Sequence, residues 1–450
     1  IEAAGGKTEV SSLFTAVKNT FKVKDIRKKI FFTLFVLIVY RIGAAITVPG
    51  VNAAALQEIS STGLASILNT FSGGGLENYS LFAMGVSPYI TAQIVVQLLQ
   101  MDIVPRFVEW SKQGEVGRRK LNQATRWLTI VLGFIQSIGI TAGFNALSTI
   151  RLVNHPGVQT YLTIGLILTA GTMFATWMGD MITERGLGNG VSMLIFAGIV
   201  AQMPGGIRQL WDDQIAGESG SALWMGIGFV TLVIVAILII VAFVTWVQQA
   251  ERRLPIQYTR RTTTSPSSSY LPLKINVSGV IPVIFAGSFI STPQTILMAF
   301  QQNHGGDSWY QIMTTIFNMQ SGPGIALYVF LIVVFTFFYA FVQVNPEKLA
   351  ENLQKQGSYI SGVRPGKGTQ DYISSLLMRL STVGSLFLGL ISLIPLIASN
   401  VWNLSQSIGL GGTSLLIIVQ IALDVVRQLN GLTMKREYIG FIREPKGGND

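Results

Sequence analysis

Long apolar runs, separated by shorter polar segments, recur along the whole chain. Ten such runs cover residues 30–48, 80–101, 122–144, 158–179, 190–204, 223–247, 277–298, 323–343, 374–396 and 411–430. Most approach the roughly 20 residues that an α-helix needs to cross a bilayer. The pattern predicts an all-α polytopic membrane protein with ten transmembrane helices.

The composition agrees with this pattern. Hydrophobic residues make up 49% of the 450 residues and charged residues 12%, whereas an average soluble domain has roughly 25% charged residues. The chain has no cysteine, which excludes disulfides, thiol catalysis and cysteine metal sites.

Positive charge is distributed unevenly between the two sides of the predicted membrane. With both termini in the cytoplasm, 29 of the 32 lysines and arginines lie in cytoplasmic segments or at their helix ends, and the exceptions are Arg41, Arg151 and Arg208. An excess of Lys and Arg on the inner side sets the orientation of multi-pass proteins. A missed or additional span would scramble this asymmetry, so that it supports the count of ten as well.

Two short motifs recur at an offset of five spans. Gly85–Ile90 and Gly279–Ile284 both read G-V-x-P-x-I, and Gly190–Ile195 and Gly412–Ile417 both read G-x-S-x-L-I. Because the offset is odd, the two copies of each motif enter the membrane from opposite sides, as in an inverted repeat. We therefore expect two inverted five-helix halves, 30–204 and 205–430. They are preceded by a tail and basic amphipathic helix (1–29) and followed by a cytoplasmic C-terminal tail (431–450).

The same motifs place aliphatic side chains near the middle of the bilayer. At about 1.5 Å per residue, the last isoleucine of each motif lies roughly 10–16 Å into a hydrocarbon core of about 30 Å. Val86 and Val191 lie one turn away on the same helix faces. Such side chains can close a pore as a dry constriction, or they can simply pack the core of a bundle. The candidate ring is Val86, Ile90, Val191, Ile195, Ile284 and Ile417.

Two further features suit a gated pore. Residues 63–75 combine small side chains with Gly73-Gly74-Gly75 ahead of a membrane helix, which predicts a mobile plug, or else an ordinary loop. The candidate plug residues are Gly63, Leu64, Ala65, Ser66, Ile67, Leu68, Asn69, Thr70, Phe71, Ser72 and Gly73. Polar side chains in the second and seventh runs predict a seam that can separate, because contacts of this kind average only about 0.6 kcal/mol. They are Ser87, Gln93, Gln97, Ser288 and Thr292.

Two basic segments, 248–276 and 345–372, are longer than the connection of two spans requires. Glycine and proline corners in them can present particular basic side chains to an acidic protein surface or to RNA phosphates. Positive-inside bias alone is the alternative explanation. The residues concerned are Arg252, Arg253, Arg260, Arg261, Lys348, Lys355, Arg364 and Lys367.

Catalytic chemistry is sparse. The chain has no phosphate-binding P-loop, no H-E-x-x-H zinc motif and no G-x-S-x-G nucleophile motif. We therefore expect no enzyme activity and no cofactor. A secondary transporter also uses inverted repeats, but its midplane site needs charges or unwound helices, whereas aliphatic residues stand there in this sequence.

Longer motifs resemble the SecY family, the central subunits of bacterial protein-conducting channels, and are most similar to the Gram-positive form. The resemblance runs from about Leu13 to Phe441. Its motifs are SPYITAQIVVQLLQMD (87–102), EWSKQGEVGRRKLNQATR (109–126), ERGLGNGVSMLIFAGIV (184–200), LPLKINVSGVIPVIFA (271–286), FVQVNPEKLAENLQKQGSYISGVRPGK (341–367) and GGTSLLIIV (411–419).

The resemblance implies a passive, gated pore in the cytoplasmic membrane that translocates unfolded preproteins and releases transmembrane segments sideways into lipid. It implies that the six aliphatic residues form the pore ring and that about 63–73 is the plug. A lateral gate lies between spans two–three and seven–eight. The implied partners are SecE, SecG, signal peptides, nascent chains, membrane lipids, and either the ribosome with its rRNA phosphates or the ATPase SecA, with Arg364 as the most telling contact. The sequence departs from the family in the tip 259–270, so that Arg260 and Arg261 map only loosely.

Overall fold

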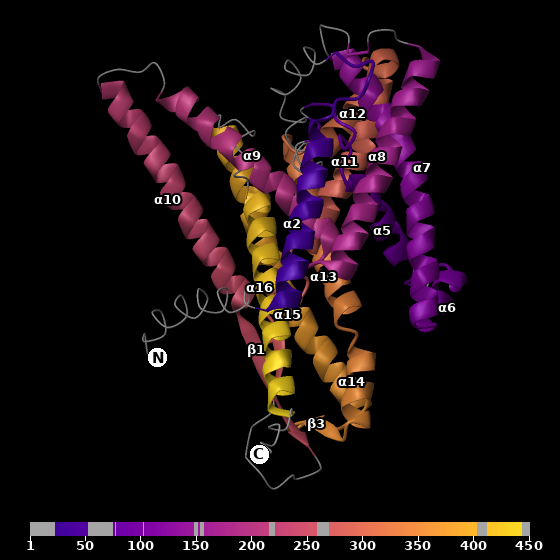
Figure 1. Ribbon diagram of the computed structural model, residues 1–450, viewed down its shortest axis with the longest axis vertical. Helices are drawn as coiled ribbons and strands as arrows, with labels where there is room; N and C mark the ends of the chain where they lie inside the picture. Colours follow the sequence, from indigo (N-terminus) through magenta and orange to yellow (C-terminus); the bar gives the residue numbers. More distant parts are fainter. Residues whose placement is uncertain are drawn as a thin grey trace, which may run out of the picture.

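The computed structural model describes residues 23–52, 75–76, 78–101, 103–147, 152–153, 157–215, 221–258, 270–402 and 412–442. Long helices run roughly side by side through the molecule (Figure 1). The first half contributes α2 (Lys24–Ala45), α5 (Ser87–Leu99), α6 (Pro105–Lys112), α7 (Glu115–Leu147), α8 (Val158–Arg185) and α9 (Gly190–Gln214). The second half contributes α10 (Ser221–Gln249), α11 (Ile281–His304), α12 (Ser308–Phe317), α13 (Gly322–Gln343), α14 (Pro346–Lys355), α15 (Lys367–Trp402) and α16 (Gly412–Ile442).

Eight helical segments of the described residues are long and apolar enough to cross a membrane. They belong to α7, α8, α9, α10, α11, α13, α15 and α16. The remaining two predicted spans coincide with α2 and with α5, which is only 13 residues long. The helical membrane architecture is thus confirmed, and the count of ten spans is consistent with it.

The two halves meet along two lines. On one side α11 packs against α5 and α7, and on the other side α9 packs against α10 and α16. A single large core cluster connects them, with buried residues from both halves, among them Tyr40, Ile94, Ile290 and Phe335. The middle of the bundle is therefore shared between the halves, while a second, smaller cluster around Tyr79 and Ile164 lies almost entirely in the first half.

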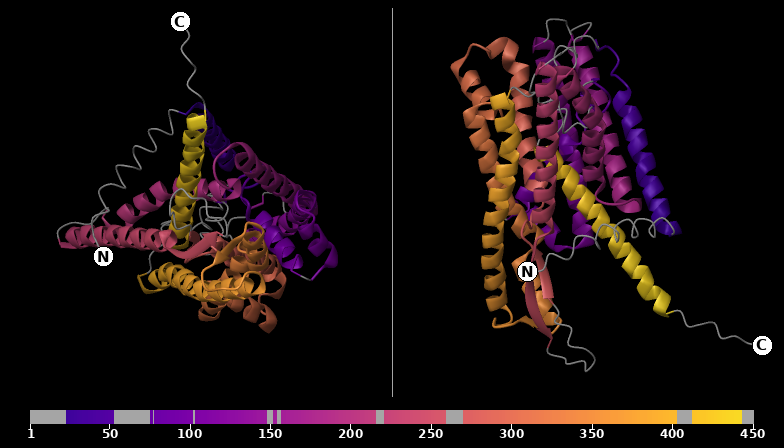
Figure 2. Two further views of the ribbon diagram at one scale, coloured as in Figure 1. Left: turned by 90° about the horizontal axis from the view of Figure 1, so that it is seen from below. Right: turned by 90° about the vertical axis from the view of Figure 1, so that its left-hand side faces the viewer.

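Several helix boundaries differ from the predicted ones. The predicted second span, 80–101, is helical only from Ser87, because a chain of tight turns with Tyr79 at φ 42° and Gly85 at φ 52° precedes Pro88. The fifth span does not end at 204 but continues to Gln214, where Leu210 packs into the protein. The basic residues 24–29 are the first turns of α2, and α16 continues past 430 to Ile442, away from the bundle (Figure 2).

The two long basic segments are joined by a small antiparallel sheet. The sequence pattern predicted no strands there. Strand β1 (Glu251–Tyr258) pairs with β2 (Tyr270–Lys274) and, on its other side, with β3 (Ser358–Ile360). Ile256 lies opposite Ile360. A core of its own holds the sheet against α14 and the ends of α13 and α15, and includes Leu254, Leu353, Ile360 and Ile373. We refer to β1–β3, α14 and the turn 361–366 as the basic module.

Candidate functional site

The two copies of G-V-x-P-x-I have the same local structure. Gly85 and Gly279 both adopt left-handed φ values, 52° and 64°, which a residue with a Cβ rarely adopts. The next residue, Val86 or Val280, is the N-cap, and a proline occupies the second helical position of α5 and of α11. Proline is well tolerated there because the first N–H groups of a helix have no intrahelical partner. The match supports the equivalence of the two halves that the repeat predicts.

The structure brings all six ring candidates into one apolar cluster. Val86, Ile90, Ile195, Ile284 and Ile417 are at most 6% exposed, and Val191 is partly buried against them. Val86 is the N-cap of α5, and the other five residues lie in α5, α9, α11 and α16. A cluster of branched aliphatic side chains without a polar group excludes water and ions from the space it fills.

Polar side chains join α11 to the first half beside this cluster. Thr292 on α11 accepts a hydrogen bond from Gln136 Nε2 on α7 at 2.7 Å, and its hydroxyl lies 3.3 Å from that of Thr91 on α5. Of the five predicted seam residues, Thr292 makes this bridge. The buried oxygens of Gln97 and Ser288 have no hydrogen-bond partner among the described residues. Sequence reasoning missed Thr91 and Gln136.

A small polar cavity lies in the same interface. It is lined by Ser87, Gln136, Ser291 and Thr295, together with Ala83, Met84 and Ile140. Its volume of about 10 Å³ corresponds to roughly one water molecule. Ser87 thus lies at this interface through the cavity, and Gln93 is a half-buried residue of α5.

Close backbone contact completes the interface between α7 and α11. Gly139 and Gly143 form a small-xxx-small pair of the kind that lets membrane helices approach closely. A Cβ at Gly139 would lie 2.8 Å from the carbonyl oxygen of Thr295, and a Cβ at Gly143 would lie 2.3 Å from Cβ of Met298. Both distances are too short for real atoms, so that only glycine fits at these positions.

We expect Gly143→Ala to destabilise the closed bundle, because the added methyl group must push α11 away from α7. Overpacking of this kind costs about 1–3 kcal/mol. The change is measured as a lower midpoint of thermal unfolding in detergent. Gly133→Ala is the matched control on the same helix, because its Cβ would meet nothing nearer than 3.6 Å. Equal shifts in the two variants would contradict the proposed close contact.

Comparison with known proteins identifies the family. The SecY family profile matches residues 80–426. The protein translocase subunit SecY 1 of Lactobacillus kefiranofaciens is 64% identical over 96% of this chain and 100% of its own length, and the SecY subunit of Bacillus subtilis is 53% identical over the same shares. The chain belongs to the SecY family.

Solved structures agree with the fold of this SecY-family chain. A protein-conducting channel matches with a TM-score of 0.62 and 16% identity over 93% of this chain and 95% of that chain. Sec61 in a canine ribosome–channel complex from the endoplasmic reticulum matches with a TM-score of 0.57 and 16% identity, over the same shares. Membership of the SecY family, together with the long apolar helices, makes the chain a multi-pass protein of the bacterial cytoplasmic membrane.

In this SecY-family chain the basic module presents most of the predicted docking residues on its surface. Arg364 is exposed at a turn between Gly362 and Gly366, whose φ values are 83° and 87°, and its carbonyl oxygen accepts a hydrogen bond from Thr369 Oγ1 at 3.0 Å. No carboxylate of the described residues forms an ion pair with the Arg364 side chain. The turn therefore holds an arginine whose charge is available to a partner.

Five of the other predicted docking residues are described, and they divide into two groups. Arg253 and Lys355 are engaged within the module, Arg253 with Glu251 at 2.8 Å and with the ring of Tyr270, and Lys355 with Glu351 at 2.6 Å. Arg252, Lys348 and Lys367 are exposed, without an ion pair to the rest of the described chain. Arg260 and Arg261 lie outside the described residues, as does the predicted plug, 63–73.

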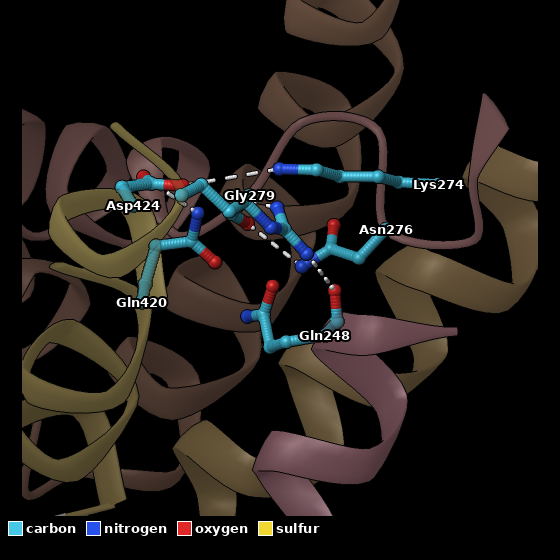
Figure 3. Close-up of polar contacts among 7 residues, drawn as sticks. Gln248, Lys274, Asn276, Gly279, Gln420 and Asp424 are labelled. Carbon is cyan, nitrogen blue, oxygen red and sulfur yellow. Dashed lines mark hydrogen bonds and ion pairs between the residues drawn. The ribbon is translucent and has the colours of Figure 1, made fainter. Parts of the chain in front are cut away.

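A polar cluster connects the basic module to α16 (Figure 3). Asp424 accepts a hydrogen bond from Gln420 Nε2 at 2.8 Å, and its Oδ1 lies 3.9 Å from both Lys274 Nζ and Arg427 Nη1. Arg427 also donates to the carbonyl oxygen of Gln248 at the end of α10, at 3.3 Å. Burial, and secondly the charge of Arg427, lower the pKa of Lys274, while Asp424 opposes the shift.

This cluster lies on the face of α16 that carries a ring candidate. Asp424 follows Ile417 by seven residues, which is almost two full turns and about 10 Å along the helix. On the other side of the cluster, Asn276 Nδ2 donates to the carbonyl oxygen of Gly279 at 3.0 Å and shapes the turn into α11, which carries Ile284. The end of β2 is therefore connected to two of the helices that supply the aliphatic cluster.

Proposed function

We propose that this chain is the pore subunit of a protein translocase, a passive channel that conducts unfolded polypeptides across the bacterial cytoplasmic membrane. Membership of the SecY family supports this function. The observation that carries the mechanism is the joining of Val86, Ile90, Val191, Ile195, Ile284 and Ile417, from both halves, in one apolar cluster. In the resting state these side chains form a collar that stops ions, and a translocating chain displaces them.

Apolar signal sequences and transmembrane segments leave sideways between α5 and α7 on one side and α11 and α13 on the other. The hydrogen bonds of Thr292 and the small polar cavity support this path, because they replace apolar packing with a few polar contacts that can be exchanged for water. Close contact of α7 and α11 at Gly139 and Gly143 keeps this gate shut in the absence of substrate.

The channel itself supplies no energy and carries out no catalysis. Elongation by a ribosome or ATP hydrolysis by SecA drives the substrate, and each docks on the basic module from the cytoplasm, where both termini lie. The exposed charges of Arg252 and Arg364 in the module, and of Lys367 directly after it, support docking of an acidic protein surface or of rRNA phosphates. SecE clamps the two halves together, and SecG is a further subunit. Residues 63–73, which lie outside the described residues, are the proposed plug.

A stalled substrate tests the channel function. A photoreactive amino acid at Ile284 is expected to crosslink to a preprotein arrested in proteoliposomes, while the same group at Phe330, which is 63% exposed on α13, yields at most a background signal. A secondary transporter would take up a small solute and give no crosslink at Ile284. Equal yields at both positions would contradict passage through the cluster.

A further inference from the structure

Helix α12 lies at the end of the bundle opposite the basic module (Figures 1 and 2). Helix α10 indicates where the two membrane surfaces lie relative to α12. Its exposed Trp224 and Trp246 are 22 residues apart (246 minus 224), which corresponds to about 33 Å of helix and matches a hydrocarbon core of about 30 Å. Exposed tryptophans gather at both membrane–water interfaces. The first turns of α10, with Trp224, are at the same end of the molecule as α12 (Figure 1).

One face of α12 is apolar and exposed. Trp309, Ile312 and Met313 are 47%, 57% and 43% exposed, and half-buried Ile316 continues their stripe with the spacing of one helix face. The opposite face, with the buried Tyr310, packs toward α11 and α13. An apolar stripe of this kind on a helix that joins two membrane spans requires a cover.

The stripe continues onto the exposed apolar surface at the end of α11. The exposed ring of Phe300 lies 6.3 Å from the ring of His304, and that ring lies 5.6 Å from the ring of Trp309. Asp307 accepts hydrogen bonds from Trp309 Nε1 at 3.2 Å and pairs with His304 Nδ1 at 2.8 Å. The polar N–H of the tryptophan is thereby satisfied within the protein, and its ring stays available to an apolar partner.

We propose that α12 is an interfacial anchor whose Trp309–Ile316 stripe inserts into the outer leaflet at the boundary between headgroups and acyl chains. The occupant is lipid, because the stripe is continuous with the exposed ring of Phe300 on α11, a helix long and apolar enough to cross the membrane. The helix itself has no charged residue, so that burial of apolar area, and not attraction to anionic headgroups, provides the binding. Anchored in this way, α12 fixes the outer ends of α11 and α13 relative to the membrane.

Site-directed spin labels in nanodiscs test this anchor. The chain has no cysteine, so that Ile312→Cys and, as a matched control on the polar side of α12, Gln311→Cys each give a single label in the full-length protein. We expect the label at 312 to collide with aqueous Ni-EDDA about threefold less often than the label at 311, and with oxygen more often, because oxygen concentrates in lipid. Met313→Cys provides a second position on the stripe.

The outcomes separate lipid from other occupants. The difference between 311 and 312 should be the same in phosphatidylcholine nanodiscs and in nanodiscs rich in phosphatidylglycerol. Equal Ni-EDDA collision rates at the two positions would overturn the proposal by showing that the stripe faces water. Shielding of 312 and 313 from both reagents would overturn it in favour of a protein cover. A dependence on phosphatidylglycerol would overturn the uncharged mode of binding. None of these outcomes depends on whether the protein conducts polypeptides.

Discussion

Replacing a collar isoleucine with serine is expected to raise the resting ion conductance of the reconstituted channel several-fold in planar bilayers. A narrow passage lined by branched aliphatic side chains stays dry, and a dry passage does not conduct ions. Serine is shorter and carries a hydroxyl that binds water, so that each substitution both widens and wets the constriction. The variants to test are Ile90→Ser and Ile195→Ser in the first half and Ile284→Ser and Ile417→Ser in the second half. We expect conductance to increase further when these substitutions are combined.

Loss of stability must be separated from loss of the seal, because truncating a buried isoleucine costs about 2–5 kcal/mol wherever it lies in a core. Ile290 and Ile332 belong to the same cluster, and each has 0% of its surface exposed, but neither belongs to the collar. Ile290→Ser and Ile332→Ser should therefore lower the thermal midpoint as much as the collar variants do while leaving the resting conductance unchanged. If these controls leak as strongly as Ile284→Ser, the collar has no special role.

The parts of this molecule that hydropathy and local motifs determine were predictable from the sequence. A bilayer admits only segments that satisfy their own backbone hydrogen bonds, so that long apolar runs had to be helices. The G-V-x-P-x-I copies encode a left-handed glycine, an N-cap and an early proline within six residues, and the motif alone thus predicted the equivalence of Gly85 and Gly279, which the backbone confirms. Burial of the four isoleucines in one cluster also followed from motif positions.

Features that depend on long-range pairing were not predictable in this way. Strand β1 pairs with β3 about a hundred residues later, at Ile256 and Ile360, and the prolines at 255 and 272 argue against strands in the polar segment where they occur. In α9, the predicted span ended at 204, but burial of Leu210 stabilises the continuation to Gln214. The Gly139-x-x-x-Gly143 pair was a readable signal of close packing that went unused, and it would have pointed to the face of α7 that carries Gln136.

Arg364→Glu is expected to reduce SecA-driven export in proteoliposomes by an order of magnitude or more. Arg364 is an exposed residue of a turn between two glycines with left-handed φ values. It has no carboxylate partner among the described residues, so that its side chain is available to pair with an acidic residue of a docking protein. Removing one member of a desolvated charge pair costs about 2–5 kcal/mol because its partner is left uncompensated, and reversal of the charge adds repulsion. The measurement is the fraction of preprotein protected from protease.

Lys112→Glu is the matched control for this reversal. Lys112 is an exposed residue in the last turn of α6, on the side that the charge distribution assigns to the cytoplasm. Its replacement by glutamate changes the net charge by the same amount as Arg364→Glu, but outside the basic module. We expect it to export normally, since electrostatic attraction between well-separated surface charges is largely screened beyond about 8 Å at physiological salt. Binding of SecA to Arg364→Glu proteoliposomes should weaken in parallel with export. Undiminished binding together with lost export would show that Arg364 acts after docking. The contacts at the end of β2 provide a route for such an effect, because Lys274 pairs with Asp424 on α16 and Asn276 bonds to Gly279 before α11. Both of these helices carry collar residues.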